Sequence, residues 1–136
     1  MPLLRGIVPK PGEVFVCDFS GYVEPEIIKT RRVVVVSPQH SGARLALVVP
    51  VSTVKPRVIL PIHVQLEGER TYGCFNGLPE VWVKADLMSH VRYDRLDRVR
   101  IRQQFIPTVS LTARDFRAVR QAVLHALGLG RLADQV

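Results

Sequence analysis

The 136-residue sequence contains only two cysteines, Cys17 and Cys74. Two thiols are too few for the disulfide framework that stabilises many small secreted proteins. No apolar run approaches the length of about 20 residues that a membrane-spanning helix needs. The N-terminal residues also lack the apolar block of a secretory signal. These absences predict a protein of the reducing cytoplasm that does not associate with membranes.

Acidic residues are missing from one long internal stretch. From Ile27 to Leu66 there is no Asp or Glu, but there are six basic residues: Lys29, Arg31, Arg32, Arg44, Lys55 and Arg57. The whole chain carries 19 Lys and Arg against 12 Asp and Glu, a formal net charge of +7. The same stretch contains the most strand-like runs, so we expect an ordered surface that binds a large anion. The commonest such anion is the backbone of a nucleic acid.

Internal repeats and low-complexity segments are also absent. With 47% hydrophobic residues, the chain can bury one real core but not two. We therefore predict a single domain over residues 1–136, with an N-terminal arm at residues 1–10. Four scattered histidines and two distant cysteines do not have the spacing of a metal site, so no metal or other cofactor is expected.

Short strand-like runs fill most of the chain. Their β-branched residues and flanking turn signals predict strands at residues 13–19, 32–37, 45–53, 58–66 and 80–84. A helical turn near residues 86–88 and one or two strands within residues 90–102 should follow. Proline cannot donate a hydrogen bond to a sheet, so Pro50 and Pro61 should lie at edges or bulges. The loop over residues 20–30 is long enough to suggest a functional role.

The end of the chain has helical rather than strand periodicity. An apolar stripe at spacings of three and four predicts an amphipathic helix over residues 112–128; it consists of Phe116, Val119, Val123 and Leu127. Thr112 is a suitable N-cap, and Gly128 is a suitable C-terminal stop. Many short strands followed by one helix predict a mainly β fold: a small, strongly bent sheet or barrel with the helix packed on it.

Five runs occur in a particular order between Pro9 and Leu129: PKPGEVFVCDF, KTRRVVVVSP, LALVVPVST, LPIHVQL and VWVKADLMSHVRYDRL. In this order they resemble the PemK/MazF toxins of bacterial type II toxin–antitoxin systems. The resemblance implies a small SH3-like barrel of the MazF/PemK/CcdB kind that forms a homodimer. It also implies an mRNA interferase, a metal-independent endoribonuclease that cuts single-stranded RNA. The products would carry a 2′,3′-cyclic phosphate and a 5′-hydroxyl, and a cognate antitoxin protein would inhibit the cleavage.

The resemblance places the catalytic arginine of the family at Arg31, at the start of the second strand. The family usually has proline next, where this chain has Arg32. Adjacent residues of a strand point to opposite sides, so only one of the two arginines can serve. The catalytic serine or threonine of the family falls on Ser52, and Thr53 is its neighbour. A planar guanidinium suits a phosphate, and a hydroxyl can hydrogen-bond one of its oxygens.

Further residues are candidates for contacts to RNA: Lys29, Arg32, Thr53, Lys55, Tyr22 and His40. Tyr22 can either stack on a base or pack its loop against the barrel. His40 can transfer protons in the site, although a lone histidine usually has no catalytic role. A non-catalytic module of the same fold, which poisons gyrase or only binds RNA, is the alternative function.

Overall fold

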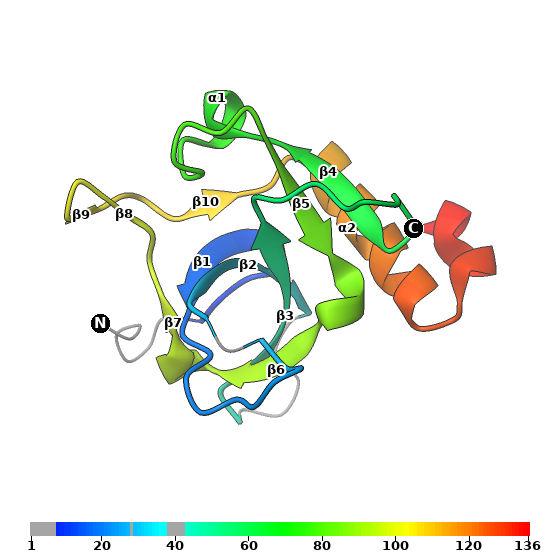
Figure 1. The fold of residues 1–136 in the computed structure, drawn as a ribbon, viewed down its shortest axis with the longest axis horizontal. Helices are drawn as coiled ribbons and strands as arrows, with labels where there is room; N and C mark the ends of the chain where they lie inside the picture. The colour runs from blue at the N-terminus through cyan, green and yellow to red at the C-terminus, as the bar shows by residue number, and fades with distance from the viewer. Residues whose placement is uncertain (1–7, 28, 38–42) are drawn as a thin grey trace.

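The computed structural model describes residues 8–27, 29–37 and 43–136. It is built mainly from short β-strands (Figure 1). The strands are β1 (Glu13–Cys17), β2 (Arg31–Ser37), β3 (Leu45–Ser52), β4 (His63–Glu67), β5 (Glu80–Lys84), β6 (Ser89–Arg92), β7 (Leu96–Asp97), β8 (Arg100–Ile101), β9 (Gln104–Phe105) and β10 (Val109–Ser110). The helices are α1 (Glu69–Tyr72), α2 (Ala113–Ala126) and the short 3₁₀ helices η1 (Ala85–Leu87), η2 (Tyr93–Arg95) and η3 (Gly130–Gln135).

Eight of the strands form one antiparallel sheet in the order β10-β1-β2-β3-β5-β4, in which β6 also pairs with β3 and β7 also pairs with β1. The sheet curls into a half-barrel, and α2 lies outside it against β4 and β5 (Figure 1). The predicted fold class, mainly β with a barrel-like sheet and a C-terminal helix, is confirmed.

The curl of the sheet depends on β3, which has two different partners on the side away from β2. Residues Leu45–Val48 pair with β6, and residues Val51 and Ser52 pair with β5. Pro50 lies between these two stretches and opposite Val33 of β2. Pro50 therefore lies in a paired central strand, where β3 changes partner, and not at the edge or bulge that the sequence predicted.

Apolar residues cover both faces of the sheet. Inside the curl, buried side chains such as Phe15, Val33 and Tyr93 form one cluster. Outside it, Val34 and Val49 join residues of β4, β5 and α2 in the second cluster. Because the side chains of β2 alternate between the two clusters, both faces of this strand are buried along its middle.

Helix α2 forms as its sequence predicts. The Thr112 side chain accepts a hydrogen bond from the Asp115 backbone N–H, and Gly128 ends the helix with a φ of 77°. Val119 is buried, but Leu127 is 58% exposed and extends past the packed part of the stripe. No helix within the described ranges is long and apolar enough to cross a membrane.

Three predictions about the elements are wrong. Residues 90–102 were expected to hold one or two strands, but β6, β7 and β8 all lie at least partly within this range. The strand predicted at residues 58–66 begins only at His63, because residues 58–60 pair with no strand in the described part of the chain and a turn follows at Pro61. The His63 ring closes this turn, since its Nδ1 accepts a hydrogen bond from the Leu60 N–H at 3.0 Å. The stretch between the strands predicted at residues 58–66 and 80–84, for which the sequence predicted no regular element, contains the short helix α1.

Candidate active site

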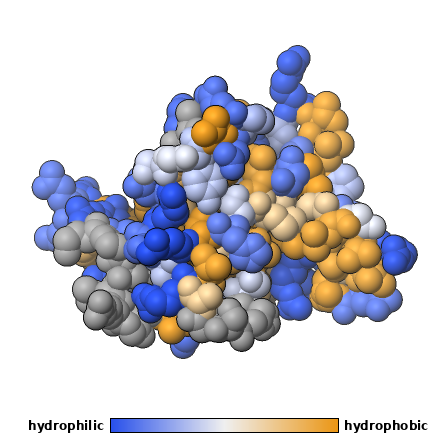
Figure 2. Space-filling view, turned by 90° about the horizontal axis from the view of Figure 1, so that it is seen from below, coloured by the Kyte–Doolittle hydropathy of each residue, from blue (hydrophilic) through white to orange (hydrophobic). Residues whose placement is uncertain are grey.

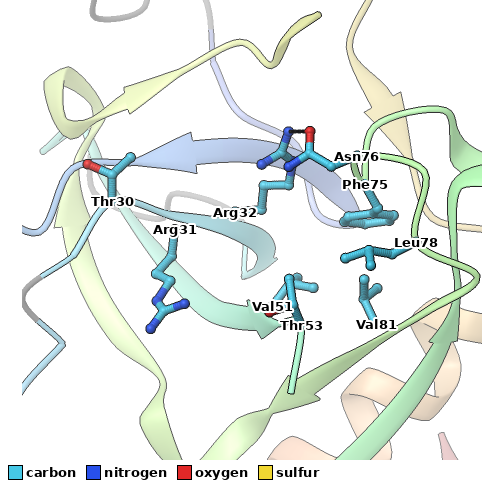
Figure 3. Close-up of a pocket in the computed structure, with 9 residues that line it drawn as sticks. All are labelled: Thr30, Arg31, Arg32, Val51, Thr53, Phe75, Asn76, Leu78 and Val81. Carbon is cyan, nitrogen blue, oxygen red and sulfur yellow. Dashed lines mark hydrogen bonds between the residues drawn. The ribbon is translucent and has the colours of Figure 1, made fainter. Parts of the chain in front are cut away.

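The alternation of β2 sends its first two arginines in opposite directions. Arg32 shares a strand face with Val34 of the outer cluster, and Arg31 shares a face with Val33 of the inner cluster. Figure 3 shows the two guanidinium groups pointing away from each other. The two arginines therefore occupy different environments although they are adjacent in the sequence.

The Arg32 side chain is bound to the loop that follows α1. Its Nε donates to the Cys74 carbonyl oxygen at 2.5 Å, and its Nη2 donates to Asn76 Oδ1 at 3.3 Å. These contacts surround a small cavity of about 100 Å³ (Figure 3), the Arg32 cavity. It is lined by Thr30, Arg31, Arg32, Val51, Thr53, Phe75, Asn76, Leu78 and Val81.

The loop that holds Arg32 is braced at its base by Gly68 and Glu69. The Glu69 N–H donates to the Leu78 carbonyl oxygen at 2.8 Å, and the Glu69 carboxylate accepts from the Phe75 N–H at 2.8 Å. A Cβ atom at Gly68 would lie 2.1 Å from the same Leu78 oxygen, so only glycine fits there. The close approach and the two hydrogen bonds of Glu69 thus join the two ends of the loop that carries Cys74 and Asn76.

A second cavity of about 210 Å³, the Ser52 cavity, lies on the other side of Arg31. It is lined by Glu24, Glu26, Ile27, Lys29, Arg31, Pro50, Val51, Ser52, Lys84 and Leu87. Arg31 and Val51 line both cavities. Among the described residues, the Arg31 guanidinium has no hydrogen bond or ion pair, so its donors face open space. The structure thus brings Arg31, Lys29 and Ser52 together.

The Ser52 hydroxyl already takes part in a local turn. Its oxygen accepts a hydrogen bond from the Val54 N–H at 3.1 Å, and its contact to the Val54 carbonyl oxygen is a weak 3.4 Å. A hydroxyl has one donor and two acceptor positions. Ser52 can therefore keep the strong contact and turn its proton toward a ligand in the cavity.

Two carboxylates in this cavity were not found from the sequence. Glu24 and Glu26 belong to the loop before β2, outside the acid-free stretch, and the fold places them beside Lys29 and Arg31. Glu26 closes its own turn, because its carboxylate accepts from the Val23 N–H at 3.0 Å. Glu24 has no such bond within the described part of the chain. The length of the loop was the only signal that pointed to these residues.

The Tyr22 side chain packs its loop against neighbouring parts of the barrel. Its ring meets Phe19 edge-on with a centroid distance of 5.4 Å, and the Arg95 guanidinium lies 5.0 Å from its centroid. Its hydroxyl donates to the His90 carbonyl oxygen at 3.3 Å. These contacts match the packing interpretation of Tyr22, and Arg95 occupies a place that a stacked base would need.

The other predicted RNA contacts are distributed unevenly. Lys29 lines the Ser52 cavity, and Thr53 lines the Arg32 cavity. Lys55 is exposed in the β3–β4 loop and lines neither of them. His40 lies outside the described residues. In the described ranges, no three His, Cys, Asp or Glu side chains gather in a way that could hold a metal ion.

Comparison with known sequences identifies the family. The profile described as "PemK-like, MazF-like toxin of type II toxin-antitoxin system" matches residues 10–127. The chain belongs to this toxin family. It is 32% identical over 111 residues to the uncharacterized Escherichia coli (strain K12) protein YifN, covering 68% of this chain and 74% of that protein. An uncharacterized Haemophilus influenzae protein is 26% identical over 147 residues, covering 93% of this chain and 95% of that protein.

Solved structures share the fold of this PemK/MazF-family chain. MazF from Deinococcus radiodurans superimposes with a TM-score of 0.66 at 21% identity, covering 90% of this chain and 98% of that one. An endoribonuclease from a mycobacterial species, solved in complex with its cognate antitoxin, superimposes with a TM-score of 0.61 at 21% identity. The match covers 89% of this chain and 96% of that one. At this identity the likeness establishes the fold alone.

Proposed function

We propose that this protein is a toxin endoribonuclease that cuts single-stranded RNA without a metal ion. Membership of the toxin family supports the class of activity. The observation that carries the proposal is the Arg31 guanidinium, which has no hydrogen bond or ion pair with any other described residue and lines the Ser52 cavity together with Lys29 and Ser52. A side chain held by the protein itself, as Arg32 is, has fewer donors left for a phosphate.

The chemistry uses the RNA's own 2′-hydroxyl. This oxygen attacks the adjacent phosphorus, a new P–O2′ bond forms, and the P–O5′ bond breaks. The products are a 2′,3′-cyclic phosphate and a 5′-hydroxyl. Arg31 stabilises the extra negative charge on the phosphorane, and Ser52 hydrogen-bonds a non-bridging oxygen. Removing one such preorganised donor costs an enzyme about 10²-fold or more in rate.

Two protons must also move, one from the 2′-hydroxyl and one to the departing 5′-oxygen. Glu24 is suited to accept the first, because this residue lines the Ser52 cavity and its carboxylate has no hydrogen bond or ion pair with other described residues. His40 remains a candidate from the sequence for either transfer. Lys29 and Thr53 are assigned to binding the flanking phosphates.

The size of the two cavities favours an extended strand over an enclosed small molecule. Pockets that enclose a small ligand usually measure about 300 Å³ or more. The Arg32 and Ser52 cavities measure about 100 and 210 Å³ and share Arg31 and Val51 as a common wall. An RNA strand that crosses this wall would place one phosphate at Arg31. The nucleotides on either side of that phosphate would lie over the two cavities.

The direct test incubates the purified protein with a long RNA in the presence of EDTA. We expect discrete fragments whose 5′ ends accept phosphate from polynucleotide kinase and whose 3′ ends are cyclic phosphates. Cleavage that stops with EDTA and returns with magnesium would mean that the metal-free mechanism is wrong.

A specific observation favours the second candidate, a toxin that binds without cleaving. The Ser52 hydroxyl already serves the turn at Val54, a role that needs no substrate. In that case the protein would bind RNA and leave it intact at all enzyme concentrations in the same assay.

We also propose a homodimer in the cytoplasm that a cognate antitoxin inhibits. Structures of family members include complexes with an antitoxin. The β3–β4 loop supports a protein contact, because Val58, Ile59 and Leu60 are each about half exposed or more. Sedimentation velocity tests the dimer. Titration of the product of an adjacent small gene into the cleavage assay tests the inhibitor, which should compete with RNA for the cations near Arg31.

A further inference from the structure

The β8–β9 hairpin is a strongly basic element outside the two cavities. It projects at one end of the molecule, and α2 lies toward the other (Figure 1). From Arg98 to Phe105 the sequence has three arginines and no acid. Hydrophilic side chains gather at the left end of Figure 2, where Figure 1 places the hairpin, and apolar ones gather toward α2 and η3. The hairpin is therefore a local concentration of positive charge.

Two of these arginines lie over the same aromatic ring, that of Phe105. Arg100 pairs directly with Phe105 across the hairpin, and its guanidinium carbon lies 4.4 Å from the ring centroid. The guanidinium carbon of Arg98 lies 4.6 Å from the same centroid. Such cation–π contacts restrain an arginine but use none of its N–H donors, so the donors stay available for a ligand.

The turn of the hairpin presents two more long polar side chains. Arg102 and Gln103 form its two-residue tip with φ angles of 51° and 67°. Such turns normally use glycine or asparagine, since a left-handed conformation strains larger residues. In the described part of the chain, the side chains of Arg100 and Arg102 have no hydrogen bond or ion pair. The tip thus exposes an arginine at a position where the backbone alone would favour a small residue.

The sheet connects the hairpin to the candidate active site. Val16 of β1 pairs with Arg32 of β2 on one side and with Asp97 of β7 on the other. Neighbouring strands are about 4.8 Å apart, so the backbone of Asp97 lies roughly 10 Å from that of Arg32, and Arg98 follows Asp97 in the chain. A strand of RNA that leaves the Arg32 cavity in this direction would meet the hairpin.

The character of the surface favours a nucleic acid over a protein partner. Protein interfaces are usually centred on apolar anchors in tight pockets. The exposed aromatic ring of the hairpin, Phe105, is 37% exposed and has arginines over it. Arg98, Arg100 and Arg102 repeat at every second residue, which suits the repeating charges of a phosphate backbone.

We propose that the hairpin from Arg98 to Phe105 is a second RNA-binding element, which holds phosphates beyond the cleaved bond. This inference rests on the proposed function, because it assumes that the Arg31 region accepts an RNA strand. The hairpin contributes to affinity for longer RNAs and takes no part in the chemical step.

The test measures binding of a fluorescein-labelled single-stranded 2′-O-methyl RNA, which cannot be cleaved, by anisotropy at several salt concentrations. If about four phosphates bind near Arg31 and about three at the hairpin, the slope of log K against log salt is about −5. The variant with Arg98→Gln, Arg100→Gln and Arg102→Gln should have a slope of about −3 and bind at least about tenfold more weakly at low salt.

Two further variants keep the result interpretable. Replacement of the same three arginines by lysine retains the charge and should retain the steep slope. The matched control Arg114→Gln, Arg120→Gln and Arg131→Gln removes three charges at α2 and η3, where Arg120 also lies near an aromatic ring, 5.9 Å from the Phe116 centroid. It should bind like the wild type. Circular dichroism melting checks that each variant folds.

The proposal is overturned if the hairpin variant and the α2 control have the same slope and affinity. It is also overturned if the hairpin variant keeps its RNA affinity but loses binding to poly-glutamate, which would assign the hairpin to an acidic protein. Cleavage of unmodified RNA by the wild type is assayed separately. A lack of cleavage there would count against the proposed function and leave the binding comparison valid.

Discussion

At the scale of single residues, the two arginines that begin β2 should differ in function. Replacing Arg32 by alanine leaves the buried Cys74 carbonyl without its partner and should destabilise the fold by about 1–3 kcal/mol. RNA affinity should fall because the loop at Asn76 loosens, but the rate with bound RNA should stay close to the wild-type rate. Urea unfolding and single-turnover kinetics measure the two effects.

The matched control is Arg32→Lys. An ammonium group lacks the fork that reaches both Cys74 and Asn76, so it should recover the charge but only part of the stability. A large loss of single-turnover rate in Arg32→Lys, with affinity unchanged, would assign the catalytic role to Arg32.

Strand alternation was enough to predict that only one of these arginines serves the site. It could not tell which, because the partners of Arg32 come from a loop more than forty positions along the chain. Glu24 was missed because no local pattern shows that the loop before β2 folds beside Ser52 and Lys84. The absence of acids between Ile27 and Leu66 is a property of the sequence, and the fold supplies carboxylates to the Ser52 cavity from outside that stretch.

At the scale of elements, the position of the loop after α1 should affect both the stability of the fold and the binding of RNA at the candidate site. Gly68→Ala places a methyl group against the Leu78 carbonyl oxygen, 2.1 Å away, so the backbone must move. We expect a loss of stability of about 1–3 kcal/mol and weaker RNA binding, because the displaced loop carries the groups that hold Arg32. Chemical denaturation and anisotropy measure both.

Gly73→Asn is the control for this prediction. Gly73 has a φ of 67°, which asparagine tolerates, and nothing lies within 4 Å of a Cβ placed there. This variant should be close to wild type in both measurements. Equal behaviour of the two variants would mean that the close approach at Gly68 does not position the loop.

Elements with a strong local signal were predicted well. Helix α2 has an apolar stripe, a Thr112 cap and a glycine stop, and all three are present in the structure. The start of β4 was placed too early, since the apolar run before Pro61 looks like a strand but pairs with none of the described strands. Pairing depends on contacts far apart in the chain, and those are not visible in a local pattern.

At the scale of the whole molecule, the two buried thiols should make the fold sensitive to alkali. Burial raises the pKa of Cys17 from 9.0 to about 12 and that of Cys74 from 9.0 to about 11. Above pH 9 the thiols lose their protons in the unfolded chain before they lose them in the folded one. Their contribution to the free energy of unfolding is therefore fully present below pH 9 and falls as the pH rises toward 12. Each thiol contributes a decline of roughly 1.4 kcal/mol per pH unit in its window.

Urea unfolding between pH 8 and 11 checks this prediction, at about half-unit steps. Cys17→Ala should reduce the pH dependence, although it costs some stability at every pH because it leaves a small void. An unchanged dependence in both Cys17→Ala and Cys74→Ala would indicate that other groups control the alkaline transition.

The proposed function depends most on Arg31, which would stabilise the transition state of RNA cleavage. The most direct measurement compares single-turnover cleavage of a long single-stranded RNA by wild-type protein and by Arg31→Ala, in EDTA, with binding of the 2′-O-methyl RNA measured in parallel. The single-turnover rate should be at least about 100-fold lower in Arg31→Ala, with a much smaller change in affinity. Turnover near the wild-type rate in Arg31→Ala would contradict it.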